Sequence, residues 1–339
     1  MNSDSRWTRR DFLKASVAAA ATTSLWPALV SAKDASQPGR GLVVWVRHRN
    51  VMDDNGNVDV GILAEMIDRA VCDLSGEKEP RDAWAHFVKP TDTVGVKVNT
   101  LGLKHVRKSS LVAHFRAVGD VVAKRVAEIV GQPEKVTIWD RYDRELKAAG
   151  FEINRNGKGV QCFGWKKRIG ASDKEYRVGT KKTRFSRILD EDVSALINVP
   201  VPKTHRIAGI TGALKNHYGS IVNPRDFHGN GCTEPGIPEL NALPPIREKT
   251  RLILVDALWT VIEGGPGWNR EAMRPTRSVL VSTDPVAVDR VLLKIIDDAR
   301  RAEGLPPREP FVRFLALAEK QALGVADLGR IKIVKIELG

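Results

Sequence analysis

Short apolar runs alternate along the chain with longer segments of helical periodicity. The runs contain β-branched residues, as strands buried on both faces do. They predict strands at residues 41–46, 93–98, 135–139, 195–199, 251–255, 278–281 and 331–336. Helical spacing and stop signals predict helices at 59–74, from Ser109 or Ser110 to Val130, and at 144–149, 286–301 and 311–323. This alternation predicts an α/β fold with a mainly parallel sheet flanked by helices.

One segment interrupts the alternation. Residues 154–187 are rich in Lys, Arg and Gly and lack periodicity, so we expect a basic irregular insertion with one hairpin. Elsewhere, Asp284 before Pro285 predicts a helix cap with proline in the first turn. Residues 263–267 (EGGPG) predict a tight turn rather than a loop that cradles a cofactor.

The first 32 residues have the pattern of a targeting segment. Thr8 to Lys14 (TRRDFLK) is typical of a twin-arginine export signal, and a weakly apolar run from Ala15 to Val30 follows it. Small residues before Lys33 predict cleavage there, and Pro27 argues against a spanning helix. We therefore expect a signal peptide at residues 1–32, one α/β domain at 33–339, and a periplasmic protein carried by the twin-arginine translocase.

Charge and composition narrow the class of partner. The chain has 339 residues, 42% hydrophobic and 28% charged, which excludes collagen, a disordered tail and a polytopic membrane protein. Its formal net charge of +13 favours an anionic partner. Basic residues are scattered and aromatic residues are only 6%, which argues against nucleic acid and for a small anionic ligand.

The segment from Asn198 to Asn223 carries the candidate catalytic residues. It begins where a predicted strand ends, which is where ligands collect on parallel sheets. Lys203 and Lys215 are predicted to neutralise an anion, and His205 to act as a proton donor or ligand. The alternatives are solvated surface charges for the two lysines and a structural role for the histidine.

Other polar residues near strand ends are predicted to bind the ligand: Lys97, Asn99, Thr211, Gly212, Asn216 and Asp256. Asp256 is placed either to contact a ligand or to orient a histidine, and the alternative is a loop hydrogen bond. His205, His217 and His228 are the candidate ligands of a divalent metal, although their spacing matches no standard zinc module.

Several motifs share their order with a known family: VGVKVN at 94–99, IWD at 138–140, PKTH at 202–205, TGALKN at 211–216, EGGP at 263–266 and STDPVAVD at 282–289. With Gly219 and Asp256, this pattern resembles the domain-of-unknown-function 362 family across residues 41–339. No reaction common to the members of this family is known, so the resemblance predicts the fold and leaves the chemistry open.

Members of that family are often associated with iron–sulfur clusters, which implies a redox link and a ferredoxin-like or membrane redox partner. This chain departs from them, because Cys72, Cys162 and Cys232 are its only cysteines and none belongs to a C-x-x-C pair. We expect no iron–sulfur cluster on this chain alone.

Three hypotheses follow from the sequence. The first is an exported metal- or cofactor-dependent enzyme acting on a small anionic substrate. The second is a periplasmic protein that binds an anion or a metal without catalysis. The third is adhesion to a polyanion through the basic residues between Lys166 and Arg187.

Overall fold

A computed structural model of the chain describes residues 40–103, 112–167 and 169–339. The expected export segment at residues 1–32 and the expected helix start at Ser109 or Ser110 lie outside these residues. The main strands are β1 (Leu42–His48), β2 (Val94–Lys97), β3 (Val136–Asp140), β4 (Gln161–Gly164), β7 (Ala195–Asn198), β8 (Lys203–His205), β9 (Gly209–Thr211), β10 (Thr250–Val261), β11 (Met273–Ser282) and β12 (Lys332–Leu338).

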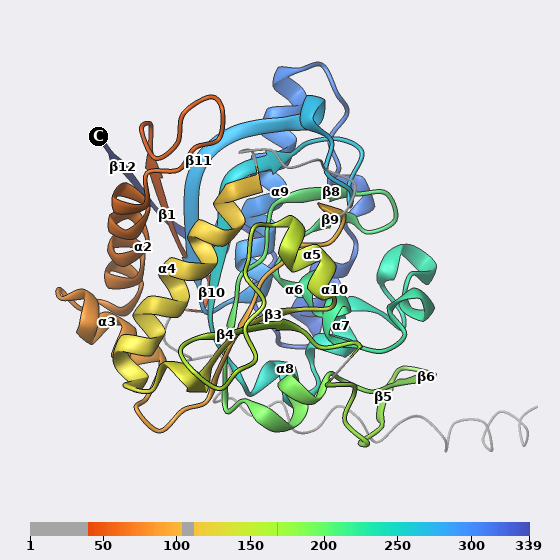
Figure 1. Ribbon diagram of the computed structural model, residues 1–339. Helices are drawn as coiled ribbons and strands as arrows, with labels where there is room; N and C mark the ends of the chain where they lie inside the picture. The colour runs from red at the N-terminus through yellow and green to blue at the C-terminus, as the bar shows by residue number, and fades with distance from the viewer. Residues whose placement is uncertain (1–39, 104–111, 168) are drawn as a thin grey trace, which may run out of the picture. The chain divides into compact units, whose positions relative to one another are not determined.

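These strands form one mixed, mostly parallel sheet (Figure 1). Its main path runs β12–β1–β11–β10–β7–β2–β3–β4, and β8 and β9 extend from the end of β10. Along this path only β11 is antiparallel to its neighbours, β1 and β10. The other neighbouring pairs of the path are parallel, which confirms the predicted fold class.

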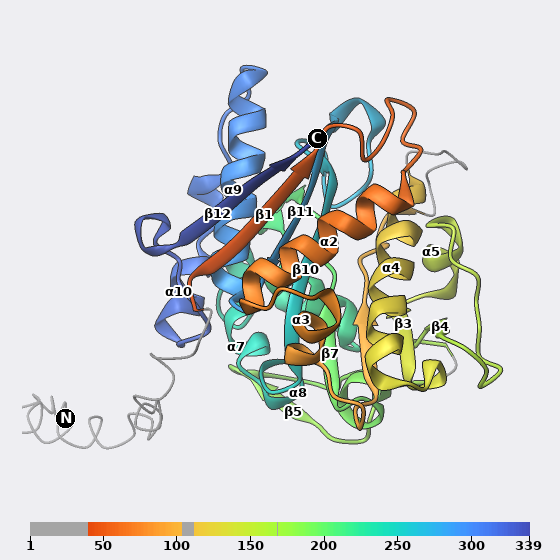
Figure 2. The same cartoon turned by 90° about the vertical axis from the view of Figure 1, so that its left-hand side faces the viewer.

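Helices cover both faces of the sheet (Figure 2). They are α2 (Val60–Ser75), α3 (Pro80–Phe87), α4 (Ala113–Val130), α5 (Asp143–Ala148), α6 (Ala213–Asn216), α7 (Ile237–Asn241), α8 (Pro244–Arg247), α9 (Pro285–Ala302) and α10 (Phe314–Lys320). Side chains alternate between the faces, as in any strand. In β1, for example, Val44 and Val46 pack in the core that contains α2 and α4, whereas Val43 packs in the core that contains α9.

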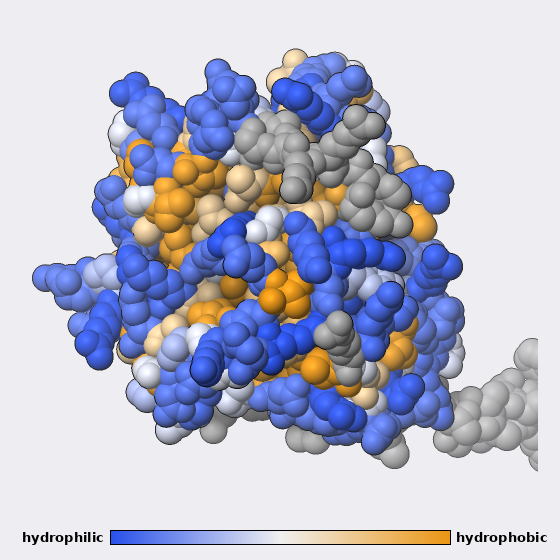
Figure 3. All heavy atoms as spheres, viewed as in Figure 1, coloured by the Kyte–Doolittle hydropathy of each residue, from blue (hydrophilic) through white to orange (hydrophobic). Residues whose placement is uncertain are grey.

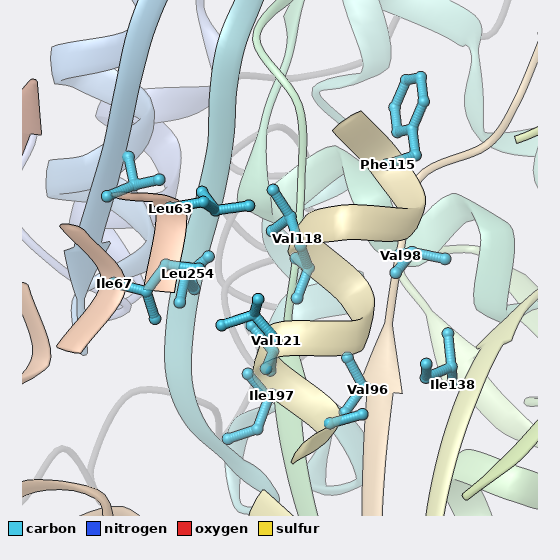
Figure 4. Close-up of a cluster of buried hydrophobic side chains, with 14 of the residues drawn as sticks. Leu63, Ile67, Val96, Val98, Phe115, Val118, Val121, Ile138, Ile197 and Leu254 are labelled. Carbon is cyan, nitrogen blue, oxygen red and sulfur yellow. The ribbon is translucent and has the colours of Figure 1, made fainter. Parts of the chain in front are cut away.

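The α2–α4 face holds a continuous apolar core (Figure 4). Val118 and Val121 of α4 pack in one cluster with Val96 of β2 and Ile197 of β7, and all four are buried. Burying a Val or Ile side chain contributes about 1.5–3 kcal/mol. This layer therefore holds the ends of β2, β7 and β10 at fixed positions.

The sequence did not predict helix α3, strand β4 or the short elements β8, β9, α6, α7 and α8. Helix α3 lies in a polar stretch with few apolar positions, and it buries Ala83, Trp84 and Phe87. Strand β4 lies in the basic insertion, where it pairs in parallel with β3. The insertion also contains the expected hairpin, formed by β5 (Tyr176–Val178) and β6 (Lys181–Thr183).

Asp284 was predicted to cap a helix. Asp284 caps α9, because its side chain accepts hydrogen bonds from the backbone of Val286 and Ala287, as expected. Among the described residues, no helix is both long enough and apolar enough to cross a membrane. On the face shown in Figure 3, hydrophilic side chains surround smaller apolar areas.

Candidate functional site

A buried ion pair lies at the carboxyl ends of β2 and β3. Val94 and Val96 face the α4 side of the sheet, so Lys97 points to the opposite side, where its Nζ lies 2.8 Å from Asp140 Oδ1. Burial alone would raise the pKa of Asp140, but the charge of Lys97 and hydrogen bonds from Lys97 and Thr100 outweigh it and lower that pKa. Burial lowers the pKa of Lys97, and the charge of Asp140 acts against this, so each group is the main counter-ion of the other.

Three buried amides extend this pair into a network. Asn216 Oδ1 accepts hydrogen bonds from Lys97 Nζ at 3.3 Å and from Asn99 Nδ2 at 3.1 Å. Asn216 Nδ2 donates to Asn198 Oδ1 at 2.7 Å. The structure thus brings together Lys97, Asn99 and Asn216, which are distant in sequence. Fully satisfied networks of this kind fix side-chain positions.

Lys203 lies at the other end of the same network. Its side chain is completely buried, and its Nζ donates to Asn99 Oδ1 at 3.0 Å and to the carbonyl of Leu101 at 3.2 Å. The Nζ atom also lies 4.8 Å from the ring centroid of Trp268. Within the described part of the chain, no carboxylate pairs with it. Burial lowers the pKa of Lys203 to about 7.

Lys215, on α6, is the third buried lysine of the site. Its Nζ lies 3.5 Å from the ring centroid of Tyr218 and 3.3 Å from Nε2 of His228. His228 Nδ1 donates to the carbonyl of Pro224, which leaves the Nε2 lone pair for the lysine. Burial lowers the pKa of Lys215 to about 8, although the Cys232 thiol acts against it. No carboxylate among the described residues pairs with Lys215 either.

His205 lies beside His228, the partner of Lys215. Its ring stacks on that of His228 with centroids 5.7 Å apart. Burial lowers the pKa of His205 strongly, and the positive charges of Lys215 and Lys203 add to this effect. Its Nδ1 accepts hydrogen bonds from the backbone of Ile207 and Ala208, so the neutral ring carries its proton on Nε2. His205 is thus set up as a hydrogen-bond donor.

The three histidines do not assemble into the metal site considered above. His217 is buried separately, with its ring nitrogens near Asn198 and Ser220. Across residues 40–103, 112–167 and 169–339, no group of three or more His, Cys, Asp or Glu side chains is placed to hold a metal ion. The three cysteines are free, and two of them are buried. This donor set does not fit a resident metal or cluster.

Gly212 and Thr211 were both predicted to bind the ligand, and the structure gives them different neighbours. Asp289 of α9 accepts hydrogen bonds from the backbone of Ala213 and Leu214 and so holds the start of α6. A Cβ atom on Gly212 would lie 2.1 Å from Asp289 Oδ1, so this glycine is explained by close packing. Thr211 pairs with Lys203 across β8 and β9, and its buried Oγ1 has no hydrogen-bond partner among the residues that the structure describes.

Asp256 lies on the other face of the sheet from Lys97. It shares its side of β10 with Leu254 and Leu258, which face α4. There Oδ2 of Asp256 lies 2.7 Å from Nδ1 of His114, in the first turn of α4, and both side chains are buried. Asp256 therefore orients a histidine. His114 has no local sequence pattern, and its partner lies 142 residues away, so the sequence offered no signal for it.

Trp268 connects the two sides. Its ring centroid lies 6.0 Å from that of His114 and 4.8 Å from that of Phe115, while Lys203 approaches the same ring. Contacts thus run without a break from Asp256 through Trp268 and Lys203 to Lys97. The combination of buried cations, neutral imidazoles and fixed amides suits an anion and proton transfer to or from it.

One of the comparisons with known proteins identifies the family. No curated protein matches the chain. Among solved structures, the crystal structure of a protein from Thermotoga maritima is similar, with 12% identity and a TM-score of 0.39 over 78% of this chain and 60% of that one. A family model described as Domain of unknown function (DUF362) matches residues 94–294, a range that contains every site residue discussed above. Since this range covers more than half of the chain, the chain belongs to the DUF362 family.

Proposed function

We propose that the chain is an enzyme acting on a small anionic substrate at the carboxyl edge of the sheet. The observation that carries the proposal is the pair of buried lysines, Lys203 and Lys215, which have no carboxylate partner among the described residues. An ion removed from water without a counter-ion costs several kcal/mol. A substrate anion would supply the missing charge.

The same groups support proton transfer as well as binding. With a pKa of about 7, Lys203 exchanges a proton readily at neutral pH. The neutral ring of His205 offers an N–H donor at Nε2. Lys215 would hold the anion, Lys203 would donate or accept the proton, and His205 would donate a hydrogen bond from Nε2. Asn99 and Asn216 hold Lys203 and Lys97 in fixed positions and play no chemical part themselves.

The test compares wild-type protein with Lys203→Met and Lys215→Met. Each protein is incubated with the small-molecule fraction of a cell extract, and the compounds are followed by anion-exchange chromatography and mass spectrometry. We expect the wild type to convert at least one anionic compound, and both variants to lose this conversion at least tenfold. Lys124→Met, at an exposed position on α4, is the control and should behave as wild type.

Two outcomes would refute the proposal. Retention of an anionic compound without conversion would favour a binding protein, which was the second sequence hypothesis. Conversion that survives in both lysine variants would place the reaction elsewhere.

We further propose export to the periplasm through the twin-arginine translocase. The support is the motif at residues 8–14 together with the small residues before Lys33. Cell fractionation should find the wild type in the periplasm, and the double change Arg9→Lys and Arg10→Lys should retain the protein in the cytoplasm. An unchanged distribution would contradict this proposal.

A further inference from the structure

Hydrogen-bonding groups without a polar partner lie at and against the ring of Trp268. Within the described residues, Nε1 of Trp268 and Nε2 of His114 are both buried without a hydrogen-bond partner. Lys203 has three N–H donors, of which two are used by Asn99 and Leu101, and its Nζ lies over the face of the Trp268 ring. Buried polar atoms are nearly always paired, so two such atoms against one ring require an explanation.

The three groups differ in whether they donate or accept a hydrogen bond. The indole Nε1–H and the remaining N–H of Lys203 are donors. Asp256 Oδ2 lies 2.7 Å from His114 Nδ1, and a carboxylate only accepts, so Nδ1 is the nitrogen that carries a proton in the tautomer that this contact selects. Nε2 of His114 then has a free lone pair and acts as an acceptor. The set is therefore two donors and one acceptor, with positive charge at one donor.

Packing fixes the geometry of this set. Phe115 meets the Trp268 ring edge-on, with an interplanar angle of 89°, and His114 is held by Asp256. A Cβ on Gly102 would lie 3.1 Å from the backbone of Gly267, so two loop segments touch beside the tryptophan. These contacts restrict the movement of the Trp268 and His114 rings, and a preorganised site reduces the cost of binding.

We propose that this site binds an anion carrying an O–H proton next to its charge, such as hydrogen phosphate or an α-hydroxycarboxylate. The anionic oxygens accept from Lys203 and Trp268, and the O–H donates to Nε2 of His114. This inference rests on the proposed function and deepens it by naming the substrate class. It also assigns His114 as a substrate-contacting residue and Asp256 as the residue that positions it.

The test uses two inorganic anions of similar size. Hydrogen phosphate carries an O–H near neutral pH and sulfate does not. Binding of each to the full chain is measured by isothermal titration calorimetry at pH 7 in a buffer without other oxyanions. We expect phosphate to bind at least about tenfold more tightly than sulfate, because one additional hydrogen bond to a buried acceptor separates them.

Three variants assign the contacts. His114→Asn keeps an amide N–H near the position of Nδ1 for Asp256 but removes Nε2, so we expect it to weaken phosphate binding alone and abolish the preference. Trp268→Phe keeps an aromatic ring but removes the indole N–H donor, so the affinities for both anions should fall by a similar factor. Lys203→Met should abolish binding of both. His86→Asn changes an exposed histidine of α3 and should leave both affinities unchanged.

The outcomes separate this inference from the proposed function. Equal affinities for the two anions in the wild type would overturn the inference while leaving an anion site intact. A preference that survives in His114→Asn would also overturn it. If neither anion binds, this inference fails, and the conversion assay with Lys203→Met and Lys215→Met decides the proposed function separately. Should His114→Asn not fold, the wild-type ratio and the Trp268→Phe result still decide the question.

Discussion

Replacing Lys203 with methionine should stabilise the protein while removing its anion site. Burial lowers the pKa of this lysine from 10.5 to about 7. At 1.36 kcal/mol per unit, the shift corresponds to a destabilisation of about 5 kcal/mol at low pH. The variant leaves two acceptors, Asn99 Oδ1 and the Leu101 carbonyl, without their donor, at about 1–1.5 kcal/mol each. We expect a net gain of about 2 kcal/mol at pH 6.

The pH dependence gives the sharper signature. Between pH 7 and 10.5 the unfolded chain binds a proton at Lys203 that the folded chain has released, so wild-type stability rises with pH in this window. The cost of the charged lysine falls by about 3 kcal/mol between pH 6 and pH 9. The stability of Lys203→Met relative to wild type should therefore decline by this amount over the same range.

Urea unfolding followed by tryptophan fluorescence at pH 6, 7, 8 and 9 measures both quantities. The buffers contain no phosphate or sulfate, because a bound anion would stabilise the wild type alone. Burial also lowers the pKa of Lys215, but this residue is present in both proteins, so its effect on stability cancels in the difference between them. The free energy of unfolding of Lys124→Met should stay within about 0.5 kcal/mol of the wild-type value at every pH. A difference that does not change with pH would refute the reasoning.

Two further changes test the scaffold of the site by urea unfolding. Gly212→Ala should cost about 2–3 kcal/mol, because its Cβ would lie 2.1 Å from Asp289 Oδ1 and displace the cap of α6. Gly229→Ala, with nothing within 4 Å, is its control, and equal losses would contradict this explanation. Asp140→Asn should cost about 3–5 kcal/mol, because it leaves Lys97 buried without a counter-ion. A loss below about 1 kcal/mol would show that Lys97 is neutral in the folded protein.

The sequence predicted most of the sheet for a simple physical reason. Runs such as residues 93–98 must be buried on both faces, and periodicity identifies them without tertiary information. Strand β4 was not predicted, because its four residues lie in a polar context and become a strand only by pairing with β3. Helix α3 was not predicted either, since its apolar side is formed by three residues, Ala83, Trp84 and Phe87.

The site was only partly accessible to sequence reasoning. Lys97 ends β2 and Asn99 follows it, whereas Lys203 begins β8 and Asn216 ends α6; the topology brings these positions together at one edge of the sheet. The role of each as a ligand contact stays a prediction. His114 could not be inferred, because its environment is created by residues from β10 and from the loop after it, far along the chain.

The pairing of β12 with β1 affects how this protein reaches its native state. Leu42 aligns with Lys332, and the register continues to His48 and Leu338. An early strand thus acquires its outer neighbour from a segment near the other end of the chain. Contacts of such high sequence separation slow folding, since a long loop must close before they form. Until then β1 exposes unpaired backbone groups, which are a template for aggregation. Folding intermediates that lack β12 should therefore be the species most dependent on chaperones.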